Sequence, residues 1–254
     1  TFTASVSGTS ETPVYTWTPE GSAVSISGSG SSRTATASQT GSSTLKLKAE
    51  INGKSKIIEK QLIVYDLSIT CDELYAKSAG NKTVSIQLPG YDSSYSAAWE
   101  SETETVAVLS GSSDASRTIQ PRAGGTTKII VTATLAYKNL DNTNKTIRRE
   151  KTIHVVEISG LTSFIAGEKA RALSNVSPDS SIQYKWESAD STKAEIDQNT
   201  GKITAKNGNV NIKLIASLNG KSVTETKQIK ISTCNVTEPT DIVKGEVYNC
   251  SCII

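Results

Sequence analysis

The chain has 254 residues, of which 36% are hydrophobic and 20% are charged, and its formal net charge is +2. A charge this balanced excludes electrostatic attraction to nucleic acid or to an anionic membrane as the main mode of binding. No apolar run approaches the roughly 18 residues that a membrane-spanning helix needs, so we expect no membrane span.

The first part of the chain has the pattern of β-strands. Apolar and charged residues alternate over residues 45–51, and a period of two turns one face of a strand to a core and the other to water. Asn52-Gly53 follows directly. Because both residues accept positive φ, this dipeptide between alternating runs predicts a β-hairpin that closes with a strand through Val64.

The middle part replaces this tight turn with a longer polar excursion at residues 136–151. The excursion predicts a protruding loop or an extended hairpin. Its last residues, Arg148, Arg149 and Lys151, form a candidate contact loop because exposed insertions often carry binding functions. A solvated strand is the alternative. His154 is the only histidine, and without nearby cysteines or clustered carboxylates it predicts neither a metal site nor an activated nucleophile.

The last part repeats the first. Residues 45–64 and 212–231 align without gaps, share nine identical residues and contain the same Asn-Gly turn. Trp17, Trp99 and Trp186 mark three copies of one pattern, and we expect each indole to fill the core of one sandwich. The repeat therefore predicts an all-β fold of three tandem Ig-like β-sandwich domains in an elongated rod with short linkers.

The predicted boundaries follow from the repeat. The domains are residues 1–66, residues 67–157 with the hairpin insertion 136–151, and residues 158–232, followed by a cysteine-containing tail, 233–254. The first domain is one opening strand shorter than the other two ahead of its tryptophan. Two explanations stay open: the sequence is cut from a longer protein, or the tail of another copy completes the open edge by strand exchange.

The third copy carries the most specific pattern. It contains Trp186-Glu-Ser188, then Ala194-Glu-Ile196-Asp197, then Gly201-Lys-Ile203-Thr-Ala205, and then Gly208. This pattern resembles the bacterial Ig-like group 2 family of intimin- and invasin-type adhesins, bacterial surface proteins and phage structural proteins. The resemblance implies a display or adhesion module, and the family has no shared catalytic site to carry over.

Cysteines and linker acids are the remaining chemical candidates. Cys71, Cys234, Cys250 and Cys252 permit three full pairings. In an extracellular chain, a bridge from Cys234 to Cys250 or Cys252 would tie the tail back on itself, while free thiols and an interchain bridge are the alternatives. Asp66 and Glu157 lie in the linkers, and one acid in each is too few for calcium, which takes six or more oxygens. We therefore expect no metal, no cofactor and no catalytic site.

These patterns favour a non-catalytic module for structural display or adhesion on an extracellular surface, either a bacterial cell envelope or a phage particle. The expected partners are neighbouring Ig-like domains, copies of the chain itself, or a host surface protein or glycan, but not nucleic acid. The alternative is a filament subunit in which the tail of one copy completes the first sandwich of the next. A weaker third hypothesis is a carbohydrate-binding module that uses Tyr91 and Tyr95 as a sugar contact.

Overall fold

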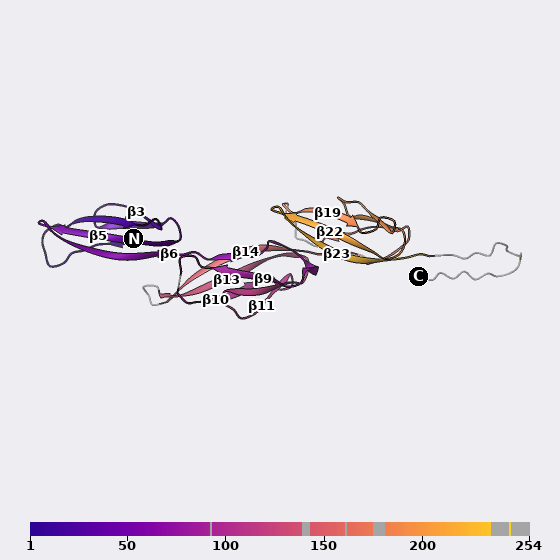
Figure 1. Cartoon of the computed structure of the whole chain (residues 1–254), viewed down its shortest axis with the longest axis horizontal. Coiled ribbons are helices and arrows are strands. Elements are labelled where there is room, and N and C mark those ends of the chain that lie inside the picture. Colours follow the sequence, from indigo (N-terminus) through magenta and orange to yellow (C-terminus); the bar gives the residue numbers. More distant parts are fainter. Residues whose placement is uncertain (92, 139–142, 161, 175–180, 235–243, 245–254) are drawn as a thin grey trace. The chain divides into compact units, whose positions relative to one another are not determined.

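The computed structural model describes residues 1–254 except 92, 139–142, 161, 175–180, 235–243 and 245–254. The regular secondary structure of the described residues consists of β-strands (Figure 1) and one short 3-10 helix, η1. The elements are β1 (Phe2–Thr3), β2 (Val14–Glu20), β3 (Val24–Ser27), β4 (Ser32–Ala37), β5 (Gly41–Ile51), β6 (Lys54–Val64), β7 (Ser68–Thr70), β8 (Leu74–Ala76), η1 (Lys77–Ala79), β9 (Lys82–Gln87), β10 (Tyr95–Ser101), β11 (Ala107–Ser110), β12 (Ser116–Pro121), β13 (Gly125–Lys138), β14 (Asn144–Val156), β15 (Ile158–Ser159), β16 (Ser163–Ile165), β17 (Lys169–Arg171), β18 (Leu173–Ser174), β19 (Gln183–Ser188), β20 (Ala194–Ile196), β21 (Lys202–Ala205), β22 (Val210–Leu218) and β23 (Lys221–Ser232).

Two compact units divide the chain. The first unit comprises residues 1–70, 85–98 and 131–149, and the second comprises residues 71–84, 99–130 and 150–254. The long strands β13 and β14 contribute residues to both units. The division into three domains and the rod shape stay predictions.

The strands form successive pairs of sheets. The first pair has the strand orders β1-β4-β3 and β2-β5-β6, and the middle pair has β11-β12-β9-β7 and β10-β13-β14-β8. The third pair has β17-β21-β20 and β16-β23-β22-β19, next to a two-stranded sheet, β15-β18. The Ig-like all-β sandwich class that the alternation predicts is confirmed.

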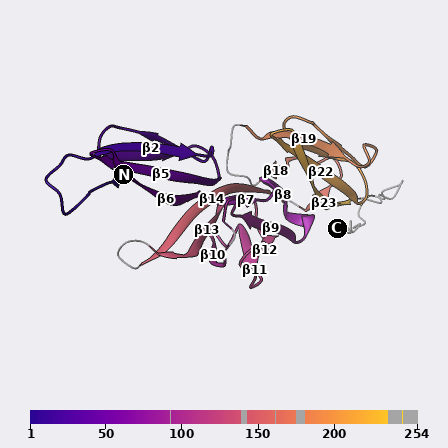
Figure 2. The same cartoon turned by 60° about the vertical axis from the view of Figure 1, so that its left-hand side comes forward.

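The hairpins form where the sequence predicts them. Asn52 and Gly53 have φ of 48° and 75°, and Asn219 and Gly220 have φ of 50° and 76°, the left-handed conformation of a tight hairpin turn. Figure 2 shows β5 and β6 side by side. Neighbouring strands β13 and β14 form the extended hairpin of the middle part, with residues 139–142 between them outside the described residues.

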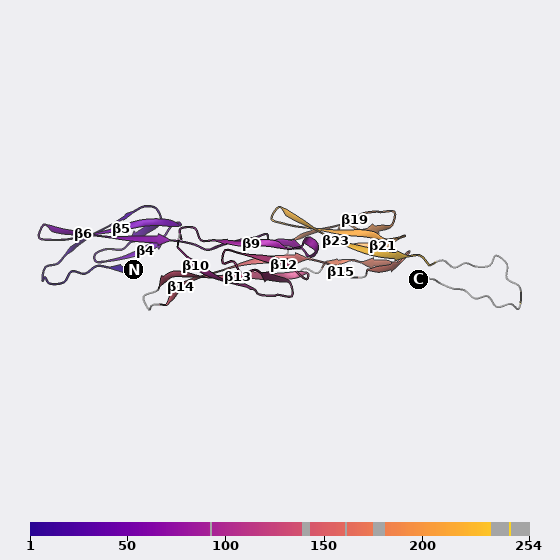
Figure 3. The ribbon, with the colours of Figure 1, turned by 60° about the horizontal axis from the view of Figure 1, so that its bottom comes forward.

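The tryptophans differ from the prediction of three equal core residues. Trp186 of β19 is only 5% exposed and lies in a large buried cluster with Ile203 and Leu214. Figure 3 shows β19 together with β21 and β23 of the third pair of sheets. Trp17 and Trp99 are half-buried. Their indole N–H groups donate to the Gly30 carbonyl at 3.2 Å and the Asp114 carbonyl at 3.1 Å. An indole that satisfies its N–H on an exposed loop stays near the edge of a core.

One strand distinguishes the first pair of sheets from the others. The last strand of the middle copy, β14, pairs in parallel with β8, and the last strand of the third copy, β23, pairs in parallel with β16. The corresponding strand of the first copy, β6, has a partner on one side only, β5. Among the described residues, β6 is therefore an open sheet edge.

Candidate functional site at two junctions

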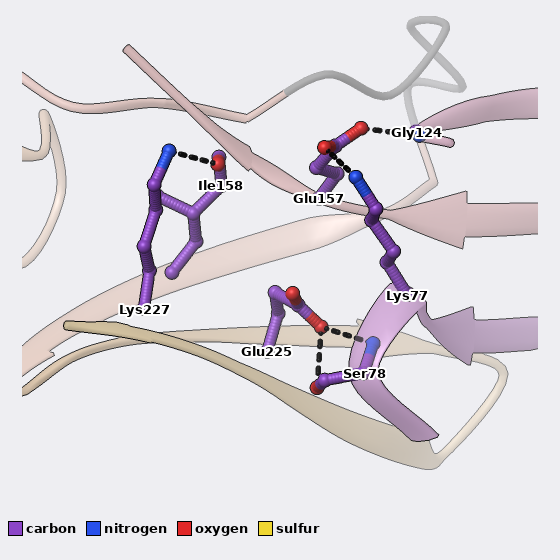
Figure 4. Close-up of polar contacts among 7 residues, drawn as sticks. All are labelled: Lys77, Ser78, Gly124, Glu157, Ile158, Glu225 and Lys227. Atoms are coloured by element: carbon purple, nitrogen blue, oxygen red, sulfur yellow. Dashed lines mark hydrogen bonds and ion pairs between the residues drawn. The ribbon is translucent and has the colours of Figure 1, made fainter. Parts of the chain in front are cut away.

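Several polar contacts of the second unit lie around Glu157, between β14 and β15 (Figure 4). Glu157 pairs with Lys77 of η1 and accepts a hydrogen bond from the backbone N–H of Gly124 at 2.9 Å. Lys227 of β23 donates to the Ile158 carbonyl at 3.0 Å. We call this set, with Ser78 and Glu225, the Glu157 junction. It ties residues on both sides of the predicted boundary at residue 157.

Glu225 is the most buried charged side chain of the junction. It is 6% exposed, and it accepts hydrogen bonds from the backbone N–H of Ser78 at 2.9 Å and from the Ser78 hydroxyl at 2.7 Å. A buried carboxylate costs free energy unless such donors satisfy it, and charge-assisted bonds are stronger than neutral ones. The contact therefore holds η1 against β23 in one geometry.

Apolar packing continues through the same junction. Leu74 of β8 and Val156 of β14 belong to one buried cluster with Ile158, Phe164 and Ile231. The core of the third pair of sheets thus extends into residues of the middle copy. Because cores are close-packed, bending at this point would open voids.

The Glu157 carboxyl is held in its charged form. Burial acts to raise its pKa, but the Lys77 ammonium and the Gly124 N–H outweigh burial and bring the pKa below its usual value. A hydrogen bond and ion pair to Lys151, together with an amide hydrogen bond from Asn219, likewise lower the pKa of Glu73. These contacts of Glu157 and Glu73 are thus strongest at pH values at which the two carboxyl groups are ionised.

A cavity of about 530 Å³ lies beside the junction and is lined in part by Cys71, Asp72, Glu73 and Lys221. Its charges pair with one another: Lys221 contacts Asp72 at 3.0 Å, and Lys151 contacts Glu73 at 3.0 Å. Cys71 is a free, half-buried thiol, and burial raises its pKa. A protonated thiol is a poor nucleophile.

A second set of contacts, the Asp66 junction, lies within the first unit. Arg149 of β14 donates to the Asp66 carboxylate at 2.6 Å, and the rings of Tyr65 and Tyr91 meet edge to face at 5.5 Å. Gly90 has φ +81°, and a Cβ there would stand 2.3 Å from the Val64 carbonyl oxygen. Only glycine permits this close approach to the end of β6.

Arg148, Arg149 and Lys151 of the candidate contact loop lie on strand β14, as the strand alternative expects, and their role as a contact for a partner stays a prediction. Arg149 and Lys151 are two residues apart and share one face of the strand. Arg149 pairs with Asp66 in the Asp66 junction, and Lys151 pairs with Glu73 beside the Glu157 junction. The candidate sugar contact also changes character. The Tyr91 hydroxyl donates to the Ser94 carbonyl at 3.1 Å and accepts from the Ala136 N–H at 2.8 Å. Tyr91 and Tyr95 are both half-buried, so they do not form an open aromatic platform.

The remaining candidate residues from the sequence are the histidine and the cysteines of the tail. His154 is 6% exposed on β14, with its Nδ1 2.9 Å from the Thr126 hydroxyl. Cys234 follows β23, while Cys250 and Cys252 lie outside the described residues, so pairing in the tail stays a prediction. Among the described residues, no group of three or more His, Cys, Asp or Glu could hold a metal ion. No described helix is long and apolar enough to cross a membrane.

Comparison with known proteins gives only distant structural likenesses. No family model matches the chain, and no curated protein matches it. Three domains of the Highly Immunogenic Outer Capsid protein (Hoc) of bacteriophage RB49 share 13% identity with a TM-score of 0.35, over 91% of this chain and 92% of that chain. Invasin, a bacterial integrin-binding protein, shares 11% identity with a TM-score of 0.34, over 89% of this chain and 53% of that chain.

Mouse Protocadherin-24 EC1-3 shares 12% identity with a TM-score of 0.28, over 91% of this chain and 92% of that chain. Likenesses at these TM-scores carry no argument about function.

Proposed function

We propose that the chain is a non-catalytic structural and adhesive module displayed on an extracellular surface, either a bacterial cell envelope or a phage particle. The observation that carries the proposal is the Glu157 junction, where a buried carboxylate and a shared apolar cluster connect consecutive copies of the repeat. A module that presents a surface at a distance needs joints that resist bending. Its partners are neighbouring Ig-like domains, other copies of the chain, or a host surface protein or glycan.

We also propose that the third copy belongs to the bacterial Ig-like group 2 family. The residues of its sequence pattern contact one another or their chain neighbours: the backbone N–H of Trp186 donates to the Gln198 carbonyl at 2.8 Å, and the backbone N–H of Gly201 donates to the Asp197 carbonyl at 2.9 Å. A Cβ on Gly201 would stand 2.7 Å from the Trp186 ring. The pattern thus describes one packed corner of the sandwich and supports the resemblance.

Surface labelling tests the location. Antibodies against the purified chain should label intact, unpermeabilised cells or particles that carry it, and brief protease treatment should remove the label. Binding of chain-coated beads to host cells then tests adhesion, with beads coated with an unrelated β-sandwich protein as the control. Labelling that requires permeabilisation would contradict extracellular display.

Amide exchange tests the junction on which the proposal rests. Glu225→Ala removes the carboxylate oxygen that accepts both hydrogen bonds from Ser78, so the Ser78 amide should lose hydrogen-exchange protection in the full chain. Glu195→Ala is the matched control, since it deletes an exposed carboxylate that pairs with Lys206 on the same unit. Unchanged protection at Ser78 in Glu225→Ala would show that the contact does not hold the junction.

A second candidate function is a filament subunit assembled by strand complementation. The open edge of β6 supports this candidate, because β14 and β23 each carry a parallel partner at the corresponding place. The donor in this hypothesis is the tail of another copy, most of which lies outside the described residues. Deleting residues 235–254 should abolish filaments seen by electron microscopy, and filaments that persist would rule the donor out.

The carbohydrate-binding hypothesis is the weakest of the three. It predicts glycan-array binding that is lost on changing Tyr91 and Tyr95. Tyr91→Phe alone removes the hydroxyl that bonds to Ser94 and Ala136. If Tyr91→Phe lowers the stability of the chain but leaves its glycan binding unchanged, Tyr91 has a structural role in the Asp66 junction instead.

A further inference from the structure

An exposed isoleucine stands where the repeat places a junction residue. Two cross-strand rows correspond across the first and third copies: Trp17, Leu47 and Ile58 on β2, β5 and β6, and Trp186, Leu214 and Glu225 on β19, β22 and β23. Ile58 is therefore the structural counterpart of Glu225, which binds Ser78 in the Glu157 junction.

The middle copy has the same position. Its last strand pairs Val156 with Ala76 of β8, as the last strand of the third copy pairs Ser232 with Ile165 of β16. Arg149 precedes Val156 by the same number of residues as Glu225 precedes Ser232. Arg149 is therefore the counterpart of Glu225. Arg149 binds Asp66 in the Asp66 junction.

The position thus has one role in two copies. Arg149 and Glu225 each bind a residue that precedes their own pair of sheets in the chain. Ile58 is 59% exposed and presents an apolar side chain at the same place. The correspondence with Arg149 and Glu225, rather than the exposure of one isoleucine alone, favours a partner at this position.

The other half of such a contact is on the same chain. At the Glu157 junction, Ala76 ends β8 and leads directly into η1, which carries Ser78. Its counterpart at the end of β16 is Ile165, which is 45% exposed, whereas Ala76 is buried. The third copy therefore exposes an isoleucine at the end where the middle copy contacts its successor.

We propose that the Ile58 face of one molecule binds the Ile165 end of a second, identical molecule. This head-to-tail contact would repeat between molecules the arrangement that the Glu157 junction has within one. Two apolar side chains meet where the internal junction joins a carboxylate to a serine. The two surfaces are different, so the contact is heterologous, and a pair of molecules still has one free Ile58 face and one free Ile165 end for further molecules. The occupant of the Ile58 face is thus the end of another identical chain.

Sedimentation velocity over a range of concentrations tests this contact. The wild-type chain should associate as its concentration rises, and Ile58→Asp or Ile165→Asp should abolish association, since a carboxylate in an apolar contact is left without a partner. Ile57→Asp is the matched control, because Ile57 is 56% exposed on the same strand and points to the opposite face of the sheet. A wild-type monomer at every concentration, or equal loss in Ile57→Asp, would overturn the proposal.

Mixing the two variants tests the head-to-tail geometry. Ile58→Asp keeps an intact Ile165 end and Ile165→Asp keeps an intact Ile58 face, so an equimolar mixture should form dimers and stop there. A mixture that remains monomeric refutes the pairing. Association should survive deletion of residues 235–254, and its loss would assign the contact to strand exchange instead. A strictly monomeric chain found on a cell surface would overturn this contact and leave the proposed display function standing.

Discussion

At the scale of single residues, Gly201 shows how one side-chain-free position supports a whole sandwich. It has φ +66°, and an added Cβ would stand 2.7 Å from Cε2 of Trp186 and 3.0 Å from the Ala172 carbonyl oxygen. Trp186 cannot retreat cheaply because it lies in the buried cluster of the third pair of sheets. Glycine at this position is thus required both by backbone conformation and by packing.

We expect Gly201→Ala to lower the free energy of unfolding by about 2–3 kcal/mol, combining a strained φ with overpacking. Gly208→Ala is the matched control: its φ is +68°, and the nearest atoms to a Cβ there belong to the Lys193 side chain at 4.0 Å. It should cost only about 1 kcal/mol. Urea denaturation of both variants measures the difference, and equal losses would mean that contact with Trp186 is unimportant.

At the scale of elements, the Glu157 junction makes stability depend on pH. The pKa of Glu157 is lower in the folded chain than its usual value because Lys77 and Gly124 stabilise the carboxylate against the opposing effect of burial. The unfolded chain therefore takes up the proton at a higher pH than the folded chain does. The stability that Glu157 contributes is complete above the usual carboxyl pKa of about 4.3 and is lost as pH falls through the lower folded value.

We accordingly expect Glu157→Gln to be less stable than the wild type at pH 7 and to approach it as pH falls below about 4. Thermal unfolding monitored by circular dichroism between neutral pH and pH 3 measures the gap. Glu102→Gln serves as the comparison, since the Glu102 side chain is exposed. The difference in stability between Glu102→Gln and the wild type should stay the same across this pH range. A gap between Glu157→Gln and wild type that is constant with pH would contradict the role of the ionised carboxylate.

The elements also show what local sequence can predict. Alternation and Asn-Gly turns determine the hairpins β5–β6 and β22–β23, because those signals lie within one stretch of chain. Strands β8 and β16 are three residues long, too short for a visible period of two. They form because the last strands of their copies, β14 and β23, have a free edge with which they pair. Only the tertiary structure reveals this pairing.

The junction contacts were hidden for a similar reason. Ser78 and Glu225 are 147 positions apart in the chain, and no local pattern links them. One signal was present: Glu225 shares the inward-facing positions of β23 with buried Ile229 and Ile231. A carboxylate in such a row requires a donor from elsewhere. The linker acids Asp66 and Glu157 were recognised from sequence, but their partners Arg149 and Lys77 were not.

At the scale of the whole molecule, the copies differ in how much they bury. The described hydrophobic residues that are buried within residues 1–66 are Ala4, Ala23, Val24 and Leu45. The third copy instead has a continuous cluster of branched and aromatic side chains around Trp186. Burial of apolar surface supplies most of the stability of a domain, and the first pair of sheets also has the open edge of β6. The first copy should therefore open more readily than the third.

Hydrogen exchange on the full chain can measure this difference at two matched amides. Leu47 and Leu214 occupy the same place in their sheets, each on a central strand, with a tryptophan opposite on one side. Leu47 is half-buried and Leu214 is fully buried. Because the cross-strand register is the same around both residues, their protection should report the opening free energy of their own sheets. We expect the Leu47 amide to exchange faster than the Leu214 amide, and equal protection would mean that the sparse core and open edge of the first copy do not weaken it.

If molecules associate through Ile58, as proposed above, protection at Leu47 should rise with protein concentration in the wild type, since binding stabilises the folded state that binds. Protection at Leu47 should not rise with concentration in Ile58→Asp.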